Sequence, residues 1–236
     1  QKEFARSGED DLRTALVDLL AARVGEDGRN LRTLALNEAI VSAPKLTEKQ
    51  RRAIAWVFYL RYARQIGVGT PDAYYLILER EIAALGVDVP TGQADYQHIE
   101  YVGAGSLSIG RKSFGACIMA GVEGLFTKGF TEADIDSTLL GELRSSSFVI
   151  PAVRDPSRLQ LQLLADEDLE KRVTGVGLAS RISDLKNVIA LGRLSESEVS
   201  DEVVARVPGA APLRDAWDDD QTGLKAMTLT SVGLAL

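Results

Sequence analysis

The feature of this sequence that most limits its fold is a change in hydrophobic period near residue 90. Before that point apolar residues recur every three or four positions and the runs end at glycine or proline, which is typical of helices. A linker rich in Pro and Gly, Val87 to Gly92, follows, and after it apolar and polar residues begin to alternate, as in strands. We therefore predict an α+β fold, mostly helical, with a helical N-terminal subdomain (residues 1–90) and a mixed subdomain (91–236) of β-hairpins and short helices.

Capping residues locate the helices of the first subdomain. Three N-cap signals are present: Ser7 with Asp10, Thr47 with Gln50, and Thr70 before Pro71. The helix after Thr47 is apolar nearly all round, so we expect it at the centre of the core. Leu and Ile at helical spacing mark two earlier helices, Leu12, Leu16, Leu19 and Leu20 in one and Leu31, Leu34 and Ile40 in the other.

The second subdomain is predicted to mix strands with short helices. The expected strands are His98–Val102 and Ser106–Ile109 around a glycine turn, Phe148–Ile150 paired with Leu159–Leu164, and Leu224–Thr230. The expected helices are Ser113–Val122, one capped by Thr131 and Asp134, Asp166–Val173, Ser180–Leu191, Ser195–Val207 and a turn at Leu213–Trp217. The helix at Ser195–Val207 is expected to begin with a capping box of Ser195 and Glu198.

Charge and residue counts exclude several classes of function. The sequence has 27 Lys and Arg against 34 Asp and Glu, a formal net charge of −7, and the excess acid lies in the second half: 15 basic and 15 acidic residues in 1–118, then 12 and 19 in 119–236. This balance lacks the broad positive potential that binds nucleic acid or an anionic membrane non-specifically. One His and one Cys cannot make a four-ligand zinc site or a disulfide, so any metal chemistry would use carboxylates.

We expect a cytoplasmic protein. The longest unbroken apolar run, Ala53 to Leu60, is far shorter than the roughly 20 residues that cross a bilayer. A single thiol fits a reducing compartment. Because the chain begins at Gln1 and stops within an apolar pattern at Leu236, we expect it to be part of a longer protein.

The segment Gly103 to Ser113 is a candidate phosphate site. Gly105 and Gly110 have the spacing of a loop whose backbone amides hold phosphates at a helix N-terminus, but Arg111 stands where the lysine belongs. The other interpretation, which we favour, is a glycine-rich hairpin followed by a helix cap. A phosphate site would use Gly103, Gly105, Gly110, Lys112 and Ser113.

Three other features have ordinary structural explanations. On a strand, His98 and Glu100 share a face and have the residue types of an acid–base pair, although a polar cross-strand contact is the more frequent role. Cys117 lies on an apolar helix face and is expected in the core. The acidic run Asp218 to Asp220 lacks the alternate spacing of a calcium loop, so we expect a solvated turn.

Aromatic residues concentrate on two neighbouring helices of the first subdomain: Trp56, Phe58, Tyr59, Tyr62, Tyr74 and Tyr75. Core packing accounts for most of them. The other interpretation is a partner surface made by Tyr59, Tyr62 and Tyr75, because amphipathic rings are enriched at protein interfaces.

The segment Leu224 to Gly233 resembles the wing strand and closing helix of winged helix-turn-helix regulators, where a Leu-Thr-x-x-Gly pattern is common. The resemblance implies a DNA-binding regulator or a winged protein–protein scaffold. A basic recognition helix is missing, since Ser195–Val207 is mainly acidic, so we do not expect nucleic acid as a partner.

A second resemblance extends over most of the chain and is carried by Leu36–Ile40, Pro44–Thr47, Tyr96–Gly110, Leu125–Phe130 and the Leu-Thr ending. Together these stretches resemble an uncharacterised bacterial protein family known only by locus tags. The resemblance implies a bacterial cytosolic protein and carries no activity, cofactor or catalytic residue.

From these features we expect a non-enzymatic protein-interaction, assembly or regulatory module that binds a protein partner or a second copy of itself. The alternatives are a nucleotide- or phosphate-binding switch or enzyme acting through residues 103–113, and a winged-helix DNA-binding regulator. We expect no catalytic residue, no cofactor and no metal.

Two substitutions test the glycine-rich segment. If its glycines supply backbone freedom, Gly105→Ala lowers the free energy of unfolding, whereas Lys112→Ala, which removes an exposed charge, leaves it nearly unchanged. Chemical denaturation of both variants measures this. A nucleotide-dependent rise in melting temperature that Lys112→Ala abolishes would instead support phosphate binding.

Overall fold

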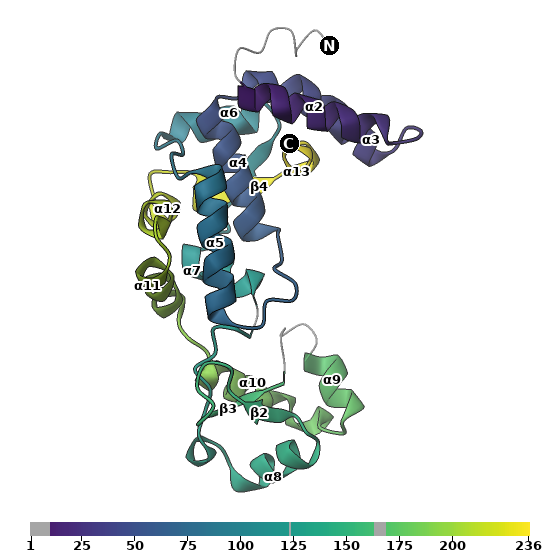
Figure 1. The fold of residues 1–236 in the computed structure, drawn as a ribbon. Helices are drawn as coiled ribbons and strands as arrows, with labels where there is room; N and C mark the ends of the chain where they lie inside the picture. Colours follow the sequence, from purple (N-terminus) through teal and green to yellow (C-terminus); the bar gives the residue numbers. More distant parts are fainter. Residues whose placement is uncertain (1–9, 123, 163–168) are drawn as a thin grey trace.

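The computed structural model describes residues 10–122, 124–162 and 169–236 (Figure 1). In this part of the chain there are twelve α-helices and four short strands, which confirms the predicted mostly helical α+β class. The helices are α2 (Asp10–Val24), α3 (Leu31–Ser42), α4 (Glu48–Arg61), α5 (Pro71–Leu85), α6 (Gln93–Tyr101), α7 (Phe114–Gly121), α8 (Ser137–Ser145), α9 (Leu169–Gly175), α10 (Ile182–Gly192), α11 (Glu196–Arg206), α12 (Ala210–Asp218) and α13 (Ser231–Ala235). The strands are β1 (Gly105–Leu107), β2 (Val149–Pro151), β3 (Leu159–Leu161) and β4 (Met227–Leu229).

The elements form three regions along an elongated molecule (Figure 1). Helices α2 and α3 lie across one end and pack their own small apolar cluster, which includes Leu16 and Ala39. A central body holds α4 to α7, α11, α12 and the β1–β4 pair around the largest cluster. A lobe of α8, α9, α10, β2 and β3 lies at the other end with a third cluster.

Helix α4 is the centre of the body, as its apolar pattern predicts. Ala53, Trp56 and Val57 are completely buried, and α4 packs against α5, α6, α7 and β4. The Trp56 indole donates a hydrogen bond to the Gly86 carbonyl oxygen at 2.7 Å, which ties α4 to the end of α5. Burial of such large apolar side chains is the main stabilising term for a body of short helices.

The local capping signals are largely confirmed. The Thr47–Gln50 and Ser195–Glu198 capping boxes are both complete, and the Thr70 side chain accepts from the Ala73 amide ahead of α5. Ser7, the expected cap of α2, lies outside the described residues, whereas Asp10 is the first residue of that helix. The Thr131–Asp134 box caps only a 3₁₀ turn, while α8 itself begins at the carboxylate of Asp136.

The prediction of a strand at residues 98–102 is wrong. This stretch belongs to α6, in which Tyr96 and Ile99, three positions apart, are both fully buried. The alternating sequence fits a strand and a helix equally well, and packing of these two side chains into the body core selects the helix. The favoured glycine-rich hairpin between residues 98–102 and 106–109 is therefore wrong as well, whereas the helix cap expected at Ser113 is confirmed.

The strand predicted at the C-terminal end of the sequence is confirmed, but it pairs with a strand that is distant in the sequence. β4 pairs antiparallel with β1, from Gly105 opposite Leu229 to Leu107 opposite Met227. The partner of β4 thus comes from the other half of the chain, so β4 is not the second strand of a local wing hairpin. The β2–β3 hairpin is confirmed, with Val149 opposite Leu161.

The division at residue 90 stays a prediction. The body cluster takes residues from both sides of that position, Leu78 from one and Phe114 and Trp217 from the other. The lobe cluster draws only on residues between Phe130 and Val188. Among the described residues, the lobe thus has an apolar core separate from that of the body, whereas residues 1–90 share their core with later parts of the chain.

Helices α7 and α11 approach each other closely at Gly115. A Cβ atom there would lie 2.0 Å from the Glu196 carbonyl oxygen, so no larger side chain fits without moving a helix. We expect Gly115→Ala to lower the free energy of unfolding by about 1–3 kcal/mol or more, as overpacked positions do.

Gly141→Ala is the matched control, because a Cβ at this position in α8 meets nothing within 4 Å. It should raise stability by about 0.5–1 kcal/mol, since alanine restricts the unfolded chain. Urea unfolding compares both variants with the wild type. Equal stability of the two variants would contradict the close helix contact.

Candidate functional site

The predicted phosphate segment is built into the body. Backbone amides of the segment already donate to protein acceptors: Leu107 to the Glu100 carboxylate at 3.2 Å, Ser108 to the Ala226 carbonyl at 2.9 Å and Lys112 to the Lys225 carbonyl at 3.0 Å. Gly103 has φ +83° and turns the chain out of α6 into β1, while Gly110 and Lys112 are exposed. These amides would have to give up protein bonds before they could hold a phosphate.

The N-terminus of α7 already has carboxylate partners. The Ser113 hydroxyl accepts from the Ala116 amide and donates to Glu196 Oε2 at 2.5 Å. The Phe114 amide donates to Asp218 Oδ1 at 2.9 Å. Because these two carboxylates occupy the place that a helix N-terminus offers to an anion, phosphate binding here stays a prediction with no support from this geometry.

The three tyrosines of the predicted partner surface have different environments. Tyr75 is 6% exposed and its hydroxyl donates to Glu202. Tyr62 is 38% exposed, and its hydroxyl oxygen accepts from the Leu229 amide at 2.9 Å. Tyr59 is half-buried and meets the Trp56 ring edge to face. They do not form one continuous surface of exposed rings, and their contact with a partner stays a prediction.

The lone histidine and cysteine have structural surroundings. On helix α6, His98 Nδ1 lies 3.2 Å from Gln50 Oε1 and the ring stacks on Tyr101. Glu100 instead binds the start of β1, so the proposed His98–Glu100 face does not form. Burial raises the pKa of the Cys117 thiol to about 11, which leaves little nucleophilic thiolate at neutral pH.

The acidic run after α12 has a structural role that the sequence did not indicate. Asp218 caps α7, and the Asp220 carboxylate pairs with Lys225 and Arg111, each at 2.7 Å. These cations lower the pKa of Asp220. Among the described residues, no group of three His, Cys, Asp or Glu side chains is placed to hold a metal ion.

One groove in the body combines concavity with exposed apolar side chains. It has a volume of about 800 Å³ and lies between α2, α4, α5 and α13; we call it the α4 groove. Its lining is mostly apolar and includes Ile54, Phe58, Leu85 and Leu234. Phe58 and Leu234 are 45% and 46% exposed, so both present apolar surface to solvent in the groove.

Polar groups frame the α4 groove. Arg51 pairs with Asp11 at 2.6 Å, which joins α4 to α2, and Arg52 pairs with Glu48 at 2.5 Å. The Tyr59 side chain also lines the groove, and its buried hydroxyl has no hydrogen-bond partner in the described structure. An apolar floor with a charged rim is the usual anatomy of a protein-binding site.

A second polar cluster joins the lobe to the body. Arg154, on the turn between β2 and β3, places Nη2 at 2.5 Å from both carboxylate oxygens of Glu202 on α11. The Tyr75 hydroxyl donates to the same carboxylate at 2.5 Å. The guanidinium carbon also lies 5.7 Å from the centre of the Phe126 ring.

Burial and the contacts within this cluster shift the pKa values of Glu202 and Tyr75. Burial by itself would raise the pKa of Glu202, but the hydrogen bonds from Arg154 and Tyr75 outweigh it and the pKa falls below its usual value. Burial, with the neighbouring Glu202 carboxylate, raises the pKa of Tyr75 to about 12. Sequence reasoning missed this cluster because its three members lie far apart along the chain.

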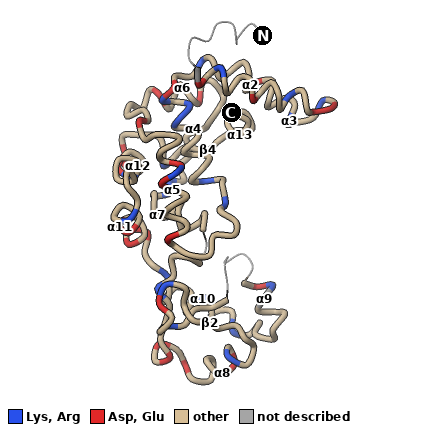
Figure 2. Tube along the Cα trace, viewed as in Figure 1, with Lys and Arg blue, Asp and Glu red and all other residues tan. Residues whose placement is uncertain are grey.

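Basic and acidic residues alternate along the chain in both the body and the lobe (Figure 2). Among the described residues, no helix is long and apolar enough to cross a membrane.

A family model matches residues 1–236, and that family is described only by a locus tag. The chain belongs to this family. The match confirms the resemblance to an uncharacterised family. No curated protein and no solved structure matches the chain.

The raised tyrosine pKa values predict a loss of stability in alkali. A hydroxyl whose pKa is higher in the folded state than in the unfolded state stabilises the fold fully below the unfolded pKa, and this contribution is lost as the pH rises through the folded pKa. Burial raises the pKa of both Tyr59 and Tyr75 from 10.0 to about 12. We expect the free energy of unfolding to fall as pH rises from 10 to about 12.

Urea unfolding across this pH range provides the measurement. Tyr75→Phe removes one of the tyrosines whose pKa is raised and should make the alkaline loss smaller. Tyr101→Phe, at a position 86% exposed, is the control and should leave the loss unchanged. An identical pH dependence in the two variants would refute the assignment to Tyr75.

Proposed function

We propose that this chain is a non-enzymatic protein-interaction module and that the α4 groove is its binding surface. The observation that carries the proposal is the exposure of Phe58 and Leu234 together in a concave, mostly apolar groove of about 800 Å³. Covering this apolar surface with a partner would remove it from water, which is the main driving force of protein association.

The form of the groove favours a helical partner. Its lining comes from helices α2, α4, α5 and α13, and it includes small residues, Ala15, Ala55 and Ala84, beside the larger Phe58 and Leu234. Small residues allow a partner helix to approach, and larger ones provide anchors for its apolar side chains.

The class of partner and the compartment are proposed from the sequence alone. The partner is either another protein or a second copy of this chain, and the proposed compartment is the cytoplasm. Neither the phosphate-binding switch nor the DNA-binding regulator has a specific structural observation that favours it.

Photo-crosslinking tests the groove. A benzophenone amino acid in place of Phe58 should give a covalent adduct in cells, either with a second copy of the chain or with another protein. The same probe at Leu76, which is 68% exposed on α5 and does not line the groove, is the control.

A charge in the groove should remove the adduct. Leu234→Asp, combined with the probe at position 58, places a carboxylate on the apolar surface and should abolish crosslinking, because a buried unpaired charge is strongly unfavourable. The melting temperature should change little, since Leu234 is 46% exposed. Equal adducts at positions 58 and 76, or none at either, would contradict the proposal.

A further inference from the structure

The lobe is an insertion whose two ends meet. The chain enters it at Thr127 and leaves it at Arg193, and these residues form an antiparallel bridge. On either side, the Gly129 amide donates to the Gly192 carbonyl at 3.2 Å and the Leu194 amide donates to the Phe126 carbonyl at 3.1 Å. The two connections, residues 126–129 and 192–194, are therefore hydrogen-bonded to each other. We call this pair of segments the neck.

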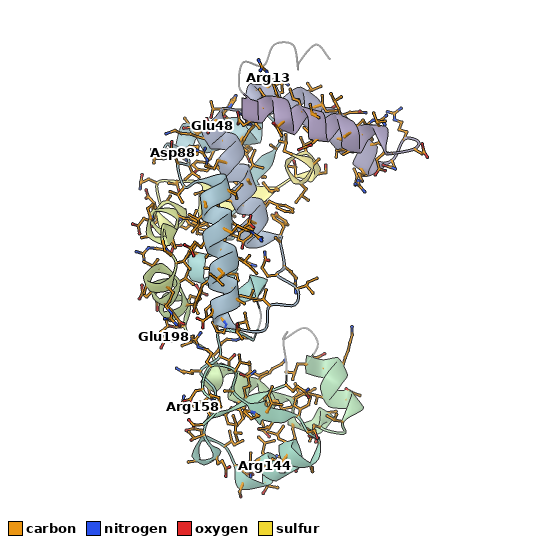
Figure 3. The ribbon with its side chains drawn as sticks, in the orientation of Figure 1. Arg13, Glu48, Asp88, Arg144, Arg158 and Glu198 are labelled. Atoms are coloured by element: carbon orange, nitrogen blue, oxygen red, sulfur yellow. The ribbon has the colours of Figure 1, made fainter. Side chains whose placement is uncertain are left out.

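The lobe has the internal support of a separate folding unit. Its apolar cluster includes Phe130, Leu143, Phe148 and Leu185, and none of its described members belongs to the body. Its ion pairs include Arg144 with Glu132 and Arg181 with Glu142, both internal. Arg144 and Arg158 lie in the lobe, whereas Glu198 lies on the body near the neck (Figure 3).

The neck is not closely packed against the body on one side. A cavity of about 460 Å³ lies there, and both strands of the neck line it, through Phe126 and Thr127 on one and Arg193 and Leu194 on the other. Met119 of α7 forms part of the opposite wall. Because this space is open to solvent and not filled by side chains, the body does not pack against this side of the neck, which has room to change its angle.

Beside the neck, where its guanidinium lies against the Phe126 ring, Arg154 holds the lobe to the body. Its guanidinium reaches from the β2–β3 turn to Glu202 on α11, and Tyr75 on α5 supports the same carboxylate. A charge-assisted pair that is largely shielded from water is strong and specific in geometry.

The Arg154–Glu202 ion pair leaves one buried polar atom without a hydrogen bond in the described part of the chain. Arg154 Nη1 is buried and has no hydrogen-bond partner among the described residues. A buried donor without an acceptor is unfavourable and offsets part of the stabilisation that the pair provides. The docked arrangement is therefore held by a bond that can be released, rather than by an extensive apolar interface.

From these observations we propose that the lobe, residues 127–193, rotates about the neck, and that the Arg154–Glu202 pair is the latch that fixes its orientation. Release of the latch changes the angle between lobe and body while each keeps its own core.

Distance measurements between two spin labels test the latch. Ala83→Cys on α5 and Ala133→Cys in the lobe provide labelling sites at exposed positions. Cys117 is 1% exposed, so it stays unlabelled. We expect one narrow distance distribution in the otherwise wild-type chain, because the latch is closed.

Removal of either latch residue should broaden or shift that distribution. Arg154→Ala removes the cation, and Glu202→Gln removes the negative charge with almost no change in shape, so the second variant gives an answer if the first folds poorly. Arg144→Ala, which breaks an ion pair inside the lobe, is the control and should keep the narrow distribution. Far-UV circular dichroism confirms that each variant is folded.

The charge-reversed pair separates a latch from general damage. Arg154→Glu with Glu202→Arg should re-form an ion pair and restore much of the narrow distribution, whereas each reversal alone should not. Unchanged distributions in both Arg154→Ala and Glu202→Gln would overturn the proposal. So would a broad distribution in the otherwise wild-type chain.

Discussion

The close contact between α7 and α11 at Gly115 is the constraint on which the arrangement of this molecule depends. Helix α7 leads into the lobe and α11 leads out of it, so their contact keeps the two ends of a long insertion side by side. The Ser113 hydroxyl reinforces the contact through Glu196, and Asp218 binds α12 to the same helix end. Without this contact, the two chain connections from the body to the lobe would not be held next to each other by the helices that precede and follow them.

Features set by neighbouring residues could be predicted from the sequence, whereas those set by distant residues could not. The Thr47 and Ser195 capping boxes depend on residues three positions apart, and both form as predicted. The α6 region was misjudged because its alternating pattern is ambiguous until Tyr96 and Ile99 meet the core. Local sequence alone does not contain that information.

The candidate sites illustrate the same limit. The glycine spacing of residues 103–113 is visible in the sequence and suggests a phosphate site. In the structure, amides of this segment instead donate to backbone carbonyls next to β4, where β1 pairs with the C-terminal part of the chain. The α4 groove and the Arg154 cluster have no sequence signature, since each collects side chains from separate elements.

The pairing of β4 with β1 also has a consequence for synthesis on the ribosome. Trp217, Leu224 and Met227 are completely buried in a core whose first members are residues 46 to 60. Contacts between residues so far apart in sequence form slowly, because a long chain segment must be closed first. The growing chain therefore carries the part of the α4 surface that meets β4 uncovered until nearly all described residues have been made, while the lobe, whose contacts are more local, can fold earlier. Premature release or stalling after the lobe would leave an aggregation-prone intermediate that depends on chaperones.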